Sequence, residues 1–336
     1  MKKIKFLYLI IFLSPFALIF LSLFNGRYPV PVQNMLQILI SPFIKNSSVQ
    51  DTYSTVIWDI RMPRAILSAF VGASLSVSGA AFQGLFRNPL VNSGMLGVSS
   101  GAGFGAALAI ILFTRSSMYV YLFALLFGGT AVFFSYTIGR IYNSSPTVML
   151  VLGGSVISSI FSALISLVKY MADPLDKLPA ITFWLMGSFA SSNTKDIFIG
   201  VPPMLFGIIG LFLIRYRINV LSMGDREAHT LGINAKLNKL MAIIFATSAT
   251  AGAVCVSGTI GWVGLIIPHI GRMIVGDDNK KLIPVSCALG ASFLILIDNV
   301  SRTITGGEIP IGILTSLIGG PFFIYILKKT KGGSWQ

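Results

Sequence analysis

The chain has 336 residues, of which 54% are hydrophobic and 11% charged, and its formal net charge is +14. Soluble domains carry about 25% charged residues, so a soluble fold this poor in charge could not cover its own surface. The basic residues stand at the ends of apolar runs, an arrangement that orients membrane proteins and argues against a nucleic-acid partner. The composition therefore predicts an all-α, polytopic integral membrane protein in contact with lipid.

Ten apolar stretches meet or approach the roughly 20 residues that a helix needs to cross a bilayer. In chain order the predicted spans are 6–24, 64–86, 92–113, 118–139, 147–168, 197–214, 237–257, 260–275, 283–301 and 312–327. The first is too long for a secretory signal, so we expect it to be uncleaved. Residues 179–189 are too short to span and are expected to form a re-entrant or interfacial helix.

The distribution of basic residues gives an orientation. With the N-terminus in the cytoplasm and ten spans, sixteen Lys and Arg residues lie inside and nine outside. This bias has the sign that the positive-inside rule requires. Both termini are then cytoplasmic, and residues 1–336 form a single transmembrane domain.

Glycine is frequent, with 34 residues, and many stand at spacings of three or four, as do Gly97, Gly101 and Gly105. Small residues at this spacing allow helices to pack closely in lipid. The longest cytoplasmic connection, 215–236, contains a short polar segment, 222–233, bracketed by Gly224 and Gly232. It is either a plain loop or a small helix offered to a cytoplasmic partner.

Motifs for enzyme chemistry are missing from the sequence. It contains no GxxxxGK[ST] phosphate loop, no HExxH and no GxSxG, so we expect no catalytic residue, no metal and no cofactor. The ionisable residues near membrane depth are Asp298, Glu308 and His269. We expect Asp298 to tether Arg302 four residues on, Glu308 to be solvated in an outer turn, and His269 to be a hydrogen-bonded packing residue.

Three arginines, Arg61, Arg64 and Arg302, fall on the outer side, where the positive-inside rule disfavours them. Pro63 is expected to mark the start of the second span. The arginines either anchor the protein at the lipid headgroups or form a basic platform for an acidic partner, because arginine pairs well with carboxylates.

Several segments together resemble the FecCD-type permeases, which import ferric siderophores, haem and vitamin B12. The segments are 61–67 (RMPRAIL), 79–90 (GAAFQGLFRNPL), 96–102 (LGVSSGA), 258–269 (GTIGWVGLIIPH) and 308–323. The resemblance runs in order from about residue 55 to 330. It implies a permease in a bacterial plasma (inner) membrane that moves its substrate by alternating access.

The resemblance also implies partners: a cytoplasmic ABC ATPase dimer, an extracytoplasmic solute-binding protein and a second permease subunit, for which we expect a homodimer. It assigns binding-protein docking to Arg61, Arg64 and Arg302. The residues it assigns to ATPase coupling are Gly224, Asp225, Arg226, Glu227, Ala228, His229, Leu231 and Gly232. Those it assigns to a cytoplasmic gate are Asn88, Pro89, Leu90, Asn143 and Ser144.

The substrate is left open by the sequence. We favour an iron complex, in particular a ferric siderophore, with haem or vitamin B12 as the alternative. A proton-coupled secondary transporter, using Asp298, Glu308 and His269, ranks lower because no deep acid without a local partner is evident. A scaffold without transport activity is the third hypothesis.

Overall fold

The computed structural model describes residues 2–26, 28–40, 51–113, 117–139 and 147–329, and within these ranges the chain forms helices and no strands. The helices are α1 Lys2–Phe24, α2 Val32–Ile40, α3 Asp51–Thr55, α4 Met62–Phe86, α5 Val98–Leu112, α6 Ser117–Gly139, α7 Thr147–Met171, α8 Lys177–Met186, α9 Thr194–Met223, α10 Asp225–Thr230, α11 Ala235–Ser257, α12 Val263–Val275, α13 Asn279–Thr303 and α14 Ile311–Lys329. A π-helical segment, Val56–Arg61, joins α3 to α4.

Seven helical stretches in the described part of the chain are long and apolar enough to cross a membrane, and three shorter apolar helices, Val98–Leu112, Val263–Val275 and Ile311–Ile326, accompany them. Each of the ten stretches predicted from the sequence overlaps one of these helices. The number of true crossings stays a prediction.

Helix α4 forms the centre of the bundle and packs against α9, α11, α12 and α13. Glycines allow the closest approaches: a Cβ on Gly72 would lie 2.1 Å from the carbonyl oxygen of Gly290 on α13, and one on Gly79 would lie 1.9 Å from that of Gly264 on α12. In lipid, where helices associate through packing, such contacts let the backbones touch. The prediction that glycines serve helix packing is confirmed at these contacts.

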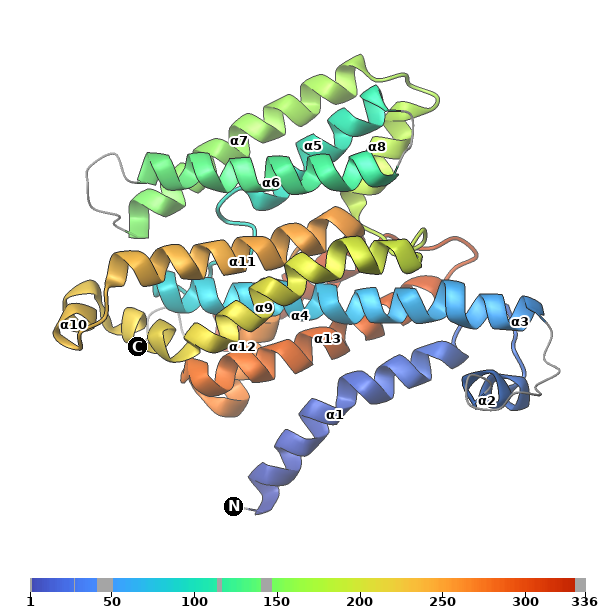
Figure 1. Ribbon diagram of the computed structural model, residues 1–336, viewed down its shortest axis with the longest axis horizontal. Helices are drawn as coiled ribbons and strands as arrows, with labels where there is room; N and C mark the ends of the chain where they lie inside the picture. Colours follow the sequence, from blue (N-terminus) through green and yellow to red (C-terminus); the bar gives the residue numbers. More distant parts are fainter. Residues whose placement is uncertain (1, 27, 41–50, 114–116, 140–146, 330–336) are drawn as a thin grey trace.

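Helices α5, α6, α7 and α8 gather on one side of this centre, and α1 lies on the opposite side (Figure 1). Gly101 and Gly105 of α5 fit against the backbone of α6 at Phe127 and Phe123. Helix α10 lies at one end of the bundle, and α2 and α3 lie at the other (Figure 1). We call these two ends of the bundle the α10 end and the α3 end.

Some predicted boundaries were wrong. The second span was expected to start at 64, but helical turns run without a break from Thr52 through Pro63 to Phe86. Proline is tolerated there because the π-helical turn already leaves backbone amides without an i→i−4 partner. Residues 92–97 and 260–262 are not helical, so α5 and α12 begin at Val98 and Val263.

Candidate functional site

The α3 end holds a mostly buried group of acidic and basic side chains: Arg61, Arg64, Asp298, Arg302 and Glu308. We call it the outer charge cluster after the side on which the sequence predicts its arginines. At its centre Arg64, which is 5% exposed, donates from Nε and Nη2 to Oδ1 of Asp298 at 2.9 and 2.8 Å. Its Nη1 donates to Oε1 of Glu308 at 2.9 Å. Arg64 thus links α4 to the end of α13 and to the turn that follows it.

The other two arginines are also turned inward. Arg61 donates to the backbone carbonyls of Leu23 and Tyr28, at 2.6 and 2.5 Å. Arg302 donates to Ser22 and to Asn299, and its Nε lies 3.6 Å from Oδ2 of Asp298. All three predicted docking arginines are therefore close together and buried, and they bind α1, α4 and α13 to one another.

These contacts settle two expectations about the acids. Asp298 does pair with Arg302 four residues on, as expected, although its shorter contacts are with Arg64. The expectation that Glu308 is solvated was wrong, because its carboxylate forms an ion pair with Arg64. This pair could not be predicted from the sequence, since 244 residues separate the partners.

At the α10 end, the segment bracketed by Gly224 and Gly232 contains a six-residue helix, Asp225–Thr230. Its inner face is fixed to the bundle: Ala228 is fully buried, and Asp225 accepts a hydrogen bond from Lys239 of α11 at 2.7 Å. The remaining residues that were assigned to coupling, apart from the buried Gly224, are exposed: Arg226, Glu227, His229, Leu231 and Gly232. The helix therefore presents a mixed polar and apolar face outward from a rigid base.

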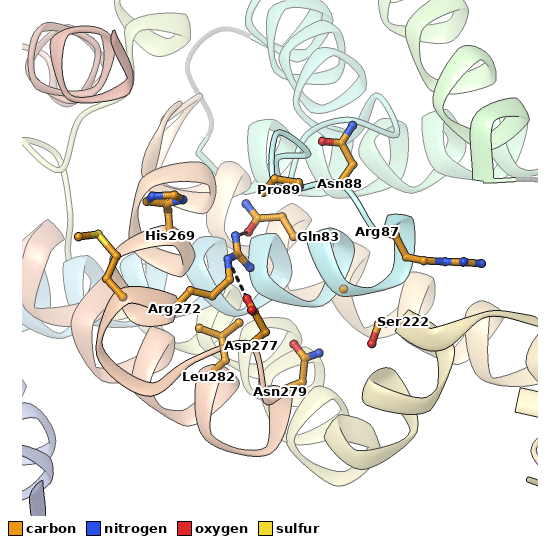
Figure 2. A pocket seen from close by; sticks show the side chains of 12 residues that line it. Gln83, Arg87, Asn88, Pro89, Ser222, His269, Arg272, Asp277, Asn279 and Leu282 are labelled. Carbon is orange, nitrogen blue, oxygen red and sulfur yellow. Dashed lines mark hydrogen bonds and ion pairs between the residues drawn. The ribbon is translucent and has the colours of Figure 1, made fainter. Parts of the chain in front are cut away.

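A cavity of about 520 Å³ lies between the ends of α4, α9 and α12 and the start of α13 (Figure 2). Its lining is both polar and apolar, and we call it the inner cavity after the cytoplasmic side that the sequence predicts for it. Arg272 donates to Oε1 of Gln83 and lies 3.9 Å from Asp277. The amide nitrogen of Gln83 donates to the carbonyls of Val91 and Gly264. Gln83 and Arg272 were not singled out from the sequence, because their partners lie far away in the chain.

The gate candidates Asn88 and Pro89 line this inner cavity, and Leu90 follows at the surface. Asn88 accepts a hydrogen bond from the backbone amide of Leu90 at 2.9 Å, which closes a turn after α4. Asn143 and Ser144 lie outside the described residues.

The start of α13 completes this region. Asn219 of α9 donates to Asp278 at 2.6 Å and accepts from the amide of Asn279 at 2.7 Å. The hydrogen bond from Asn219 holds the pKa of Asp278 below its ordinary value, because it stabilises the carboxylate. Helices α9 and α13 are thereby joined next to α10.

A second cavity, of about 430 Å³, lies between the loop before α5 with the start of α5, the end of α8, the loop before α12 with the start of α12, and the start of α14. We call it the central cavity. Its polar lining is neutral, with hydroxyl and amide groups from Asn92, Ser93, Ser99, Thr259 and Ser316. Trp262 also lines it, with a φ of 69°, a conformation that is costly for a bulky residue and that occurs at functional sites.

The described residues contain no group of three or more His, Cys, Asp or Glu side chains that could hold a metal ion. The outer charge cluster, the inner cavity and the central cavity instead offer ion pairs, hydrogen-bond donors and acceptors, and space for a ligand. These features suit the binding of partners and a change of conformation in the protein.

A model of the FecCD transport family matches residues 11–329. The chain belongs to this family. A molybdate import system permease of Haemophilus influenzae is 42% identical over 93% of the chain and 92% of its own length. A Helicobacter pylori protein named for iron chelatin transport is 42% identical over 86% of the chain and 87% of its own length.

Among solved structures, one described as an inward-facing conformation of a metal-chelate type ABC transporter matches with a TM-score of 0.84. The two sequences are 38% identical, and the match covers 95% of this chain and 97% of the other. Other relatives in the family are named as hemin and cobalamin permeases. The FecCD protein described here is thus a membrane permease component of a metal-chelate type ABC importer, and in such importers ATP hydrolysis belongs to the partner subunit.

Proposed function

We propose that this FecCD permease carries an iron chelate, in particular a ferric siderophore, inward across a bacterial inner membrane. The observation that carries the proposal is the match along nearly the whole chain to a metal-chelate type transporter, together with a 42% identical relative named for iron chelatin transport. The neutral lining of the central cavity supports it, because a bulky chelate that must also be released is better served by weak polar contacts than by a strong counter-charge.

Molybdate is the second candidate, because a relative named for its import is equally similar over slightly more of the chain. An oxyanion would be recognised by donors such as arginine or lysine. The residues that line the central cavity include neither, so this cavity favours the chelate. Haem and vitamin B12 remain alternatives of the same class.

The proposed pathway lies between two copies of the chain. Helix α7 exposes four serines at helical spacing, Ser155, Ser159, Ser162 and Ser166, on a segment that is mostly unburied. A hydroxyl stripe on an apolar helix suits a helix interface or a polar pathway better than lipid. This stripe supports a homodimer with α7 at or near the contact.

The two ends of the bundle then meet different partners. The exposed face of α10 docks on an ABC ATPase in the cytoplasm, and the outer charge cluster receives a solute-binding protein. Ten spans and cytoplasmic termini fit this arrangement, because α10 then lies inside and the cluster outside. Alternating access follows if closure of the ATPases moves α10 together with α9 and α11, to which it is fixed.

A proton-coupled transporter is disfavoured by the two most deeply buried acids in the described residues. Asp298 is paired with Arg64. Asp196 caps the first turn of α9, where it accepts hydrogen bonds from Tyr121 at 2.8 Å and from the backbone amide of Asn193 at 2.9 Å. Asp298 has a counter-charge and Asp196 has a capping role, so neither suits a proton relay within a span.

The substrate is tested by uptake into proteoliposomes that contain the permease, its ATPase and its binding protein. Labelled ferric siderophore, haem, cobalamin and molybdate are compared at equal concentration. We expect the ferric siderophore to accumulate and molybdate to stay outside. Accumulation of molybdate alone would refute the iron-chelate proposal and leave the permease assignment intact.

A further inference from the structure

The outer charge cluster is not electrically balanced. It contains three guanidinium groups and two carboxylates, so it carries an excess of one positive charge. Two of its buried polar atoms also have no hydrogen-bond partner: Nε of Arg302 and Oε2 of Glu308. Arg302 Nε lies within ion-pair distance of Asp298 without a hydrogen bond to it, and Oε2 of Glu308 is an acceptor without a donor, so neither carboxylate fully satisfies the cluster. The excess positive charge favours a carboxylate as the group that enters from outside.

The two acids differ in how firmly they are held. Asp298 is 0% exposed, lies inside α13 and contacts two arginines. The Glu308 side chain is 25% exposed, belongs to a turn without helical structure and makes a single ion pair. If a carboxylate from outside enters the cluster, Glu308 is the group that it can displace.

Displacement of Glu308 would be transmitted to α14. The next residue, Ile309, exchanges two hydrogen bonds with Ser301, at 3.2 and 2.6 Å. Two residues further on, the amide of Ile311 donates to the carbonyl of Gly187 at the end of α8, at 2.9 Å. Both α8 and α14 line the central cavity. The ion pair between Arg64 and Glu308 thus holds the turn that positions one wall of that cavity.

We propose that Glu308 is an exchangeable latch: an acidic side chain of the extracytoplasmic partner replaces it on Arg64 and thereby releases the 304–310 turn and the start of α14. The inference rests on the proposed function, in which a solute-binding protein docks at this cluster. Docking of the partner then opens the outer side, because Arg64 stays paired with Glu308 until the partner provides a carboxylate in its place.

The latch predicts that removing the internal competitor tightens docking. In nanodiscs, Glu308→Gln is expected to bind the cognate solute-binding protein about tenfold more tightly than the wild type. This factor applies if Arg64 is free of Glu308 in about 10% of wild-type molecules and in all molecules of the variant. Asp59→Asn is the matched control, because it removes an exposed carboxylate from the same end of the molecule. This control is expected to bind as the wild type does.

Affinity for the binding protein that is unchanged or weaker in Glu308→Gln would overturn the latch alone. Absence of any binding by both the wild type and the variant would overturn the proposed docking of a solute-binding protein as well. Hydrogen exchange gives a measurement that needs no partner: amides 305–312 are expected to exchange faster in Glu308→Gln than in the wild type. Equal exchange in the two proteins, measured with both folded, would contradict the latch.

Discussion

Asp298 joins two helices through its side chain. It is fully buried and contacts Arg64 of α4 as well as Arg302 of its own helix. A buried ion pair contributes little compared with a well-packed apolar pair, but removing one partner leaves an uncompensated charge. Loss of this carboxylate would therefore leave two buried guanidinium groups without their shared counter-charge.

We expect Asp298→Asn to lower the free energy of unfolding by about 3–5 kcal/mol, because two buried arginines lose their shared counter-charge. Thermal unfolding in detergent would show this as a clear fall in Tm. Asp59→Asn, on the exposed surface, should leave Tm within error of the wild type. Equal Tm values for both variants would show that the pairing of Asp298 does not stabilise the fold.

At the α10 end, Leu231 allows a test of the proposed docking of the ATPase. It is 58% exposed beside α10, where the neighbouring Ala228 is buried against the bundle. If the outward face of α10 docks on the ATPase, Leu231→Asp should abolish co-purification of the ATPase while Tm stays unchanged. Leu175→Asp introduces the same change at a 91% exposed leucine in another loop and should co-purify normally. Retention of the ATPase by the Leu231 variant would remove this residue from the docking surface.

At the scale of helices, the contact between α4 and α13 depends on the absence of side chains at Gly72 and Gly290. A Cβ at Gly72 would lie 2.1 Å from the Gly290 carbonyl oxygen, so the two helices would have to separate. Gly129 of α6 provides a comparison, because a Cβ added there would have nothing within 4 Å.

Gly72→Ala is expected to destabilise the protein by about 1–3 kcal/mol through overpacking. Gly129→Ala should instead be neutral or stabilise the protein by up to about 1 kcal/mol, because alanine favours a helix more than glycine does. Thermal unfolding of the two variants side by side compares the same chemical change in two environments. A loss of stability in both would indicate that helix packing is not the cause.

The helices could be predicted from the sequence because the length of an apolar run is a local property. The charge cluster could not be derived in the same way: hydropathy placed Arg61, Arg64 and Arg302 on one side but said nothing of their partners. Arg64 and Asp298 are separated by 234 residues, and only the packing of α4 against α13 brings them together. The resemblance pointed to the segment around α10 and to Asn88 and Pro89, whereas Gln83 and Arg272 emerged only from the three-dimensional arrangement.

For the whole molecule, the exposed serines of α7 predict a second copy of the chain nearby. Ser159→Cys should give a cross-linked dimer with a short bifunctional maleimide in native membranes. Phe134→Cys, at an exposed position on α6, should give little or none. A cross-link at residue 134 without one at 159 would place the subunit contact on α6 and refute the arrangement proposed here.

The energy source of transport distinguishes an ABC importer from a proton-coupled transporter. The permease is reconstituted with its ATPase and binding protein, and uptake of labelled ferric siderophore is measured with ATP inside the liposomes, without ATP, and with a proton gradient alone. We expect uptake that requires ATP inside the liposomes and that a proton gradient alone does not support. Uptake that follows the proton gradient and ignores ATP would contradict this expectation.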